Sequence, residues 1–181
     1  MTHEIIISGF GGQGVMAIGK TLAEAGMKEG LSVSWLPSYG PEMRGGTANC
    51  SVVLSPDEII SPMVLSPTEL IAMNKPSLIK FEPALTSGGT VLINSSIIEI
   101  KAVRDDVHAY YVPCLEIAQE LGNTKVANMV MLGAYIEATR FLKTSTIHEM
   151  LAHMFTGPKA ALVELNIEAL RRGAACIKKE A

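Results

Sequence analysis

A glycine-rich turn near the N-terminus has the residues best suited to bind a ligand. The apolar run Ile5-Ile6-Ile7 leads into Ser8-Gly9-Phe10-Gly11-Gly12-Gln13-Gly14, where Gly9, Gly11 and Gly14 have the spacing G-x-G-x-x-G. Apolar residues then recur at helical intervals, so the glycines lie between a buried strand and a helix. Bare N–H groups at such a junction attract an anion. We therefore predict a cofactor-binding turn made of Gly9, Gly11, Gly12, Gln13 and Gly14; the alternative is a turn that only packs helix against sheet.

Two nucleotide-binding alternatives fit this region less well. An NAD site needs an acidic residue near the end of the second strand, about 20 residues after the glycines. The second predicted strand, residues 32–36, is followed by Pro37 and Ser38 instead. Residues 14–21 match the pattern G-x-x-x-x-G-K-[ST], yet the residues between the two glycines continue the apolar stripe of the helix. A free-standing NAD(P)-binding Rossmann-type oxidoreductase stays as an alternative, and an ATPase is disfavoured.

A second candidate binding loop follows the second predicted strand. It reads Ser38-Tyr39-Gly40-Pro41-Glu42-Met43-Arg44-Gly45-Gly46 and lies at the carboxyl edge of the predicted sheet, where open α/β proteins bind ligands. The guanidinium of Arg44 has the planar geometry that suits a carboxylate or phosphate. We predict that Ser38, Tyr39 and Arg44 contact an anionic cofactor or a partner subunit; the alternative is that Arg44 pairs with Glu42 on an exposed loop.

Composition and length restrict the function further. The chain has 181 residues, a net charge of −3 and no basic run, so it offers no electrostatic footprint for nucleic acid. It contains neither a leader-like start nor an apolar stretch long enough to span a membrane, and we expect a cytoplasmic protein. Cys50, Cys114 and Cys176 are too far apart for a metal or disulfide motif and are expected to be small buried residues. His148 and His153 are five residues apart and cannot share a metal on one helix face.

Strand-like and helix-like segments alternate through most of the chain. This pattern predicts one α/β domain over residues 1–181, with a three-layer, mostly parallel, Rossmann-like open sheet and a helical C-terminal third. The predicted strands are residues 4–8, 32–36, 47–54, 70–74, 90–94 and 109–112, and the predicted helices are residues 12–29, 76–85, 115–121, 125–142, 145–155 and 159–177.

One predicted helix is apolar around almost its whole circumference. Residues 126–136 read Val-Ala-Asn-Met-Val-Met-Leu-Gly-Ala-Tyr-Ile, so this helix must be buried on every side. Either a second chain covers it, which would make the protein an obligate subunit, or its own C-terminal neighbours do.

Several motifs together resemble one family. They are Gly9 to Gly14 with Leu22-Ala23, Ser38 to Gly46, Leu92-Ile93-Asn94-Ser95-Ser96, and Asn128-Met129 with Leu132-Gly133. This combination resembles the gamma subunit of 2-oxoacid:ferredoxin oxidoreductases, which act on pyruvate, 2-oxoglutarate or ketoisovalerate. The resemblance runs from about Glu4 to Gly173. A subunit of indolepyruvate ferredoxin oxidoreductase is the nearest alternative within the same chemistry.

The resemblance implies a role within a larger complex. Such a complex oxidatively decarboxylates a 2-oxoacid, transfers the acyl group to coenzyme A and reduces ferredoxin. Thiamine diphosphate, magnesium and the iron–sulfur clusters are expected on the alpha, beta and ferredoxin-like delta subunits, because this chain has neither a Gly-Asp-Gly motif nor a cysteine cluster. The chain is then expected to have no catalytic residue and no metal, to form an interface, and to share the coenzyme A site with its partners. Nothing in the sequence indicates which 2-oxoacid is used.

Overall fold

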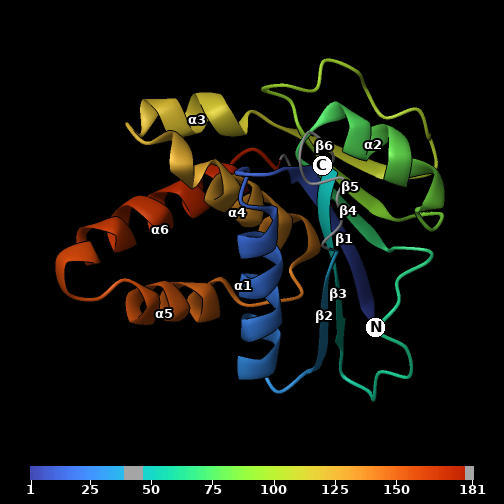
Figure 1. The fold of residues 1–181 in the computed structure, drawn as a ribbon, viewed down its shortest axis with the longest axis horizontal. Coiled ribbons are helices and arrows are strands. Elements are labelled where there is room, and N and C mark those ends of the chain that lie inside the picture. The colour runs from blue at the N-terminus through green and yellow to red at the C-terminus, as the bar shows by residue number, and fades with distance from the viewer. Residues whose placement is uncertain (39–46, 178–181) are drawn as a thin grey trace.

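The computed structural model describes residues 1–38 and 47–177, and these residues form one six-stranded sheet (Figure 1). The strand order is β2-β3-β1-β4-β5-β6. The strands are β1 (His3–Phe10), β2 (Ser32–Ser38), β3 (Thr47–Ser55), β4 (Glu69–Ala72), β5 (Thr90–Asn94) and β6 (His108–Val112).

The sheet has a parallel half and an antiparallel half. Strands β1, β4, β5 and β6 are parallel, as a sequence of alternating strands and helices predicts. Strand β3 lies between β1 and β2 and is antiparallel to both, so β1 and β2 point in the same direction without touching. The α/β fold is therefore confirmed, and the sheet is mixed, because β3 is antiparallel to both of its neighbours.

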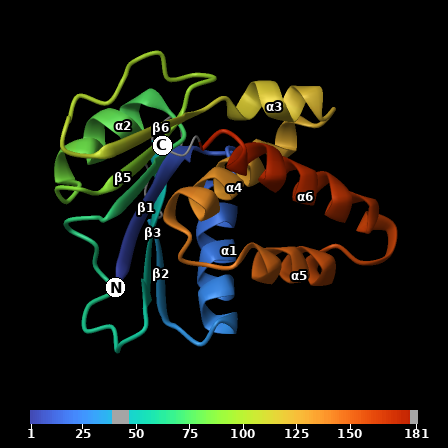
Figure 2. The ribbon, with the colours of Figure 1, turned by 180° about the vertical axis from the view of Figure 1, so that it is seen from behind.

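The helices lie on both faces of the sheet, mostly on one. Figures 1 and 2 show α2 on one face and the other helices on the opposite face. The α-helices are α1 (Val15–Lys28), α2 (Lys75–Phe81), α3 (Cys114–Glu120), α4 (Ala127–Thr139), α5 (Thr144–Met154) and α6 (Ala161–Ala174). Short 3-10 turns are η2 (Glu82–Ala84), η3 (Thr124–Val126) and η4 (Gly157–Lys159).

Alternating side chains of β1 build the core on both faces. Ile5 and Ile7 belong to the large apolar core beneath α1 and α4, whereas Ile6 belongs to the smaller core beneath α2. A strand buried on both faces has no polar alternation, which explains the continuous apolar run in the sequence. No helix within the described part of the chain is long and apolar enough to cross a membrane.

Helix α4 is covered by its own chain. Residues 129–136 are all buried, and α6 packs across α4 with more contact than any other helix. The two helices approach so closely that a methyl group on Gly133 would collide with the carbonyl of Leu170, and one on Gly173 with the carbonyl of Val130. Of the two sequence-based alternatives for this helix, burial under its C-terminal neighbours is correct. The all-round apolar surface of α4 therefore does not require a second chain.

Candidate ligand-binding cleft at the glycine turn

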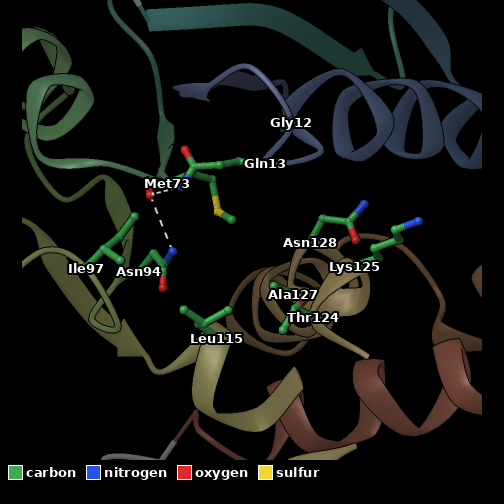
Figure 3. Close-up of a pocket in the computed structure, with 10 residues that line it drawn as sticks. All are labelled: Gly12, Gln13, Met73, Asn94, Ile97, Leu115, Thr124, Lys125, Ala127 and Asn128. Atoms are coloured by element: carbon green, nitrogen blue, oxygen red, sulfur yellow. Dashed lines mark hydrogen bonds between the residues drawn. The ribbon is translucent and has the colours of Figure 1, made fainter. Parts of the chain in front are cut away.

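The strand ends that surround the glycine turn form a crevice. Helix α1 leaves the end of β1 on one face of the sheet, and α2 leaves the end of the neighbouring β4 on the other face. Open α/β sheets bind ligands at such a point, where consecutive helices diverge. A cleft of about 240 Å³ lies here (Figure 3), lined by Gly12, Gln13, Met73, Asn94, Ile97, Leu115, Thr124, Lys125, Ala127 and Asn128.

The backbone of the turn is open at Gly11 and Gly12. A methyl group built on either residue meets no protein atom within 4 Å. Gly12 also has a φ of +91°, a conformation that side chains other than glycine rarely adopt. A second hollow of about 270 Å³ lies on this part of the turn and on the first residues of α1, whose N-terminus has no side-chain cap. The backbone at Gly11 and Gly12 is therefore free to approach a ligand.

Gly9 and Gly14 have a packing role instead. A methyl group on Gly9 would lie 2.7 Å from both Gln13 Oε1 and Met73 Cβ, and one on Gly14 would lie 2.7 Å from Asn128 Cβ. Gly14 also has a φ of +76° and directly precedes α1. These two glycines bring the turn against β4 and against the start of α4, so the turn combines both interpretations made from the sequence.

Two carboxamide side chains tie the strand ends together. Gln13 Oε1 accepts a hydrogen bond from the N–H of Phe10 at 2.6 Å, and Gln13 Nε2 donates to the carbonyl of Met73 at 3.0 Å. Asn94 Nδ2 donates to the same carbonyl at 3.3 Å (Figure 3). The ends of β1, β4 and β5 are thereby linked, and Gln13 fixes the position of the turn.

The cleft has little charge. Of the described residues that line it, Lys125 alone is charged, and its side chain is exposed beside the N-terminus of α4. A helix N-terminus and an ammonium group both favour an anion. Met73, Ile97, Leu115 and Ala127 give the remaining surface an apolar character.

The described residues offer neither a reactive thiol in this cleft nor a metal site. Burial raises the pKa of the Cys50 thiol to about 11 and raises that of Cys114 well above its usual range. Both side chains are fully buried, as predicted, whereas Cys176, for which burial was also predicted, is only partly buried. Within residues 1–38 and 47–177, no group of three His, Cys, Asp or Glu side chains is placed to hold a metal ion.

The predicted site residues are only partly brought together. Gly12 and Gln13 line the cleft, and Gly11, Gly12 and Gly14 line the neighbouring hollow. Gly9 lies behind the turn, and Ser38 is exposed at the end of β2, opposite Asn49. Tyr39 and Arg44 lie outside the described residues.

Sequence reasoning did not assign several cleft residues to the site. They are Met73, Asn94, Ile97, Leu115, Thr124, Lys125, Ala127 and Asn128. Met73 and Asn94 follow or end strands that were predicted correctly, so their place at the carboxyl edge was a usable signal. Ile97 lies just after β5, and the others come from α3, η3 and the start of α4, whose approach to the turn has no local signal.

Comparison with known proteins gives consistent matches. A family model described as "Pyruvate ferredoxin/flavodoxin oxidoreductase" matches residues 4–176. "Ketoisovalerate oxidoreductase subunit VorA" of Methanothermobacter thermautotrophicus is 41% identical over 169 residues, which are 93% of this chain and 35% of the relative. "2-oxoglutarate synthase subunit KorC" of Methanothermobacter marburgensis is 37% identical over 158 residues, 83% of this chain and 85% of the relative. The chain thus spans about a third of VorA but most of KorC.

A solved structure has the same fold along almost the whole chain. It is the gamma subunit of a keto/oxoacid ferredoxin oxidoreductase from Geobacter sulfurreducens PCA, with a TM-score of 0.81 and 28% sequence identity. The match covers 96% of this chain and 97% of that chain. The fold assigned above, including its helical C-terminal part, is therefore the fold of that subunit.

Proposed function

The chain belongs to the pyruvate ferredoxin/flavodoxin oxidoreductase family, and from this premise we propose that it is the gamma subunit of a cytoplasmic 2-oxoacid:ferredoxin oxidoreductase complex. Such a complex converts a 2-oxoacid into carbon dioxide and an acyl-CoA, and it passes two electrons to ferredoxin. Support comes from the similarity to KorC and to the Geobacter sulfurreducens gamma subunit over most of each chain. The family match gives no support to the free-standing NAD(P)-binding alternative.

The chemistry of the complex is proposed to lie mainly on its partners. We assign thiamine diphosphate, magnesium and the iron–sulfur clusters to alpha, beta and ferredoxin-like delta subunits, since the sequence has no Gly-Asp-Gly motif and no cysteine cluster. VorA is about three times as long as the segment that matches this chain, which supports a role as one part of a larger assembly. No bond-breaking step is assigned to a side chain of this subunit.

The proposed contribution of this chain is part of the coenzyme A site. The observation that carries this proposal is the open backbone at Gly11 and Gly12, next to the uncapped start of α1 and to the cleft. Coenzyme A has a pyrophosphate and a ribose phosphate, and backbone N–H groups at a helix N-terminus bind such anions. Lys125 adds a positive charge on the opposite wall. Gln13 holds the turn in position through its two hydrogen bonds, and its second N–H and second lone pair leave it as a proposed contact to the ligand.

The loop after β2 is proposed to complete this edge. Its flanking residues Ser38 and Thr47 lie at the carboxyl end of β2 and the start of β3, and Thr47 pairs with Phe10 beside the glycine turn. We therefore keep Ser38, Tyr39 and Arg44 as proposed contacts to coenzyme A or to a partner subunit. Arg44→Ala should weaken assembly or lower the activity of the complex, measured after co-purification. Unchanged assembly and activity would leave Arg44 as an ordinary loop residue.

The proposed function is tested by reconstitution. Co-expressed with the alpha, beta and delta subunits of its own genome, the chain should co-purify in a fixed ratio and form a complex that reduces ferredoxin with a 2-oxoacid and coenzyme A. Gly11→Ala in that complex should raise the KM for coenzyme A about tenfold, because a methyl group blocks the approach of the ligand to the backbone. The KM for the 2-oxoacid should not change. Failure to join these subunits would contradict the assignment, and equal effects on both substrates would contradict the coenzyme A site.

A further inference from the structure

One hydrogen-bond acceptor in the wall of the cleft has no partner. Asn94 ends β5, is only 4% exposed, and its Oδ1 receives no hydrogen bond. Buried side-chain carbonyls are nearly always paired, and an unpaired one lowers stability by about 1–3 kcal/mol. A buried acceptor beside a cleft is a candidate contact for a ligand that brings its own donor.

The orientation of the Asn94 side chain is fixed by its other half. Its Nδ2 donates to the carbonyl of Met73, which also accepts from Gln13 Nε2 (Figure 3). Rotating the amide by 180° would place Oδ1 against this carbonyl, so two acceptors would face each other. The strand ends therefore hold Asn94 with Oδ1 turned away from Met73 and toward the side of the cleft where Leu115 lies.

Two apolar side chains line the cleft together with Asn94. Ile97 and Leu115 line the same wall, and Ile97 is 41% exposed while Leu115 is partly buried. Oδ1 is itself buried, so a ligand reaches it only after a side chain of the cleft wall changes rotamer. A sugar would bring several hydroxyl groups to this wall and leave most of them unpaired. A methylene chain with a secondary amide brings one N–H donor between apolar groups.

We propose that Asn94 Oδ1 accepts a hydrogen bond from a secondary amide N–H in an uncharged arm of the ligand, which enters between Ile97 and Leu115. This inference rests on the proposed function. It assigns two parts of the ligand to two parts of the protein. The glycine turn holds the phosphates, and Asn94 recognises one amide of the pantetheine arm of coenzyme A. Asn94 is then a specificity-determining residue, because the cleft rejects arms that lack the donor.

The first experiment changes only the ligand and uses the wild-type complex without 2-oxoacid. Calorimetric titration compares coenzyme A with two analogues, each of which has an ester oxygen in place of one amide N–H of the pantetheine arm. One analogue should bind about tenfold more weakly than coenzyme A, because Asn94 then loses its donor, and the other should bind nearly as well. If both ester analogues bind as tightly as coenzyme A, the inference is wrong, regardless of how the variants bind these ligands.

The second experiment assigns the effect to Asn94. In the Asn94→Leu complex, coenzyme A should bind about tenfold more weakly, and the difference between amide and ester ligands should disappear. Gly11→Ala is the matched control: it should weaken all three ligands equally and preserve that difference. A difference that persists in Asn94→Leu overturns the assignment. If Gly11→Ala weakens binding but the esters bind normally, only the role of Asn94 fails; if neither variant affects coenzyme A, the proposed coenzyme A site fails as well.

Discussion

Two glycine-containing regions of this chain use the missing side chain in opposite ways. At the crossing of α4 and α6, the space beside Gly133 and Gly173 is filled by the backbone of the neighbouring helix. At the turn after β1, the space beside Gly11 and Gly12 contains no protein atom within 4 Å. Glycine thus permits close packing in the first region and access to the backbone in the second. The same Gly→Ala change in each region therefore tests the difference directly.

The largest effect on stability is expected for Gly133→Ala. The new methyl group collides with the carbonyl of Leu170, so α4 and α6 must move apart and lose core packing. Overpacking of this kind lowers the free energy of unfolding by about 3 kcal/mol, which exceeds the roughly 1 kcal/mol that alanine adds as a better helix former. The net loss of about 2 kcal/mol should lower the Tm by about 4–8 °C. Thermal unfolding followed by circular dichroism measures the change in Tm. An unchanged Tm would show that Gly133 is not needed for the packing of α4 against α6.

A smaller loss of stability is expected for Gly9→Ala, between those expected for Gly133→Ala and Gly11→Ala. Its methyl group would be 2.7 Å from Gln13 Oε1 and Met73 Cβ, so Gln13, whose hydrogen bonds hold the turn, must shift. We expect the free energy of unfolding to fall by about 1–2 kcal/mol, together with a higher KM for coenzyme A. Urea denaturation of the chain and kinetics of the complex measure the two effects. A loss of stability with normal coenzyme A kinetics would show that Gln13 does not need its present position.

The smallest effect on stability is expected for Gly11→Ala. The methyl group points into open space, so the free energy of unfolding should change by less than about 0.5 kcal/mol. The KM for coenzyme A should still rise, as proposed above. At this one position the approach of a ligand to the backbone is then tested without a change in packing. Gly12→Ala is a poorer probe, because a φ of +91° strains alanine by about 1–2 kcal/mol. A large drop in the Tm of Gly11→Ala would mean that the turn is packed rather than open.

The local pattern of the sequence predicted most elements, but not how they pair. The strand at Thr90–Asn94 was predicted with its exact bounds, and helix α1 began three residues later than expected. The antiparallel place of β3 was missed, because hydrophobic periodicity reports burial and does not report the neighbouring strand. The burial of α4 stayed undecided for a similar reason: its partner α6 (Ala161–Ala174) follows only after α5 (Thr144–Met154).

The candidate site divides in the same way. The glycine turn could be predicted because strand, turn and helix are consecutive in the sequence. Its two kinds of glycine could not be separated, since the contacts of Gly9 and Gly14 come from Met73 and Asn128, far along the chain. Asn94 was given as the end of a predicted strand and as part of a family motif, but the orientation that leaves its Oδ1 unpaired depends on a hydrogen bond to the carbonyl of Met73, just after β4.

The reciprocal contact between α4 and α6 has a consequence for how this family diverges. Each of Gly133 and Gly173 meets the backbone of the other helix, and no change of side chain on the opposite helix can relieve a backbone collision. A larger residue at either position is tolerable only if the interhelical distance increases, which also removes the need for glycine at the other position. Homologous sequences are therefore expected to retain both small residues or to replace both, and lineages with only one replacement should be rare.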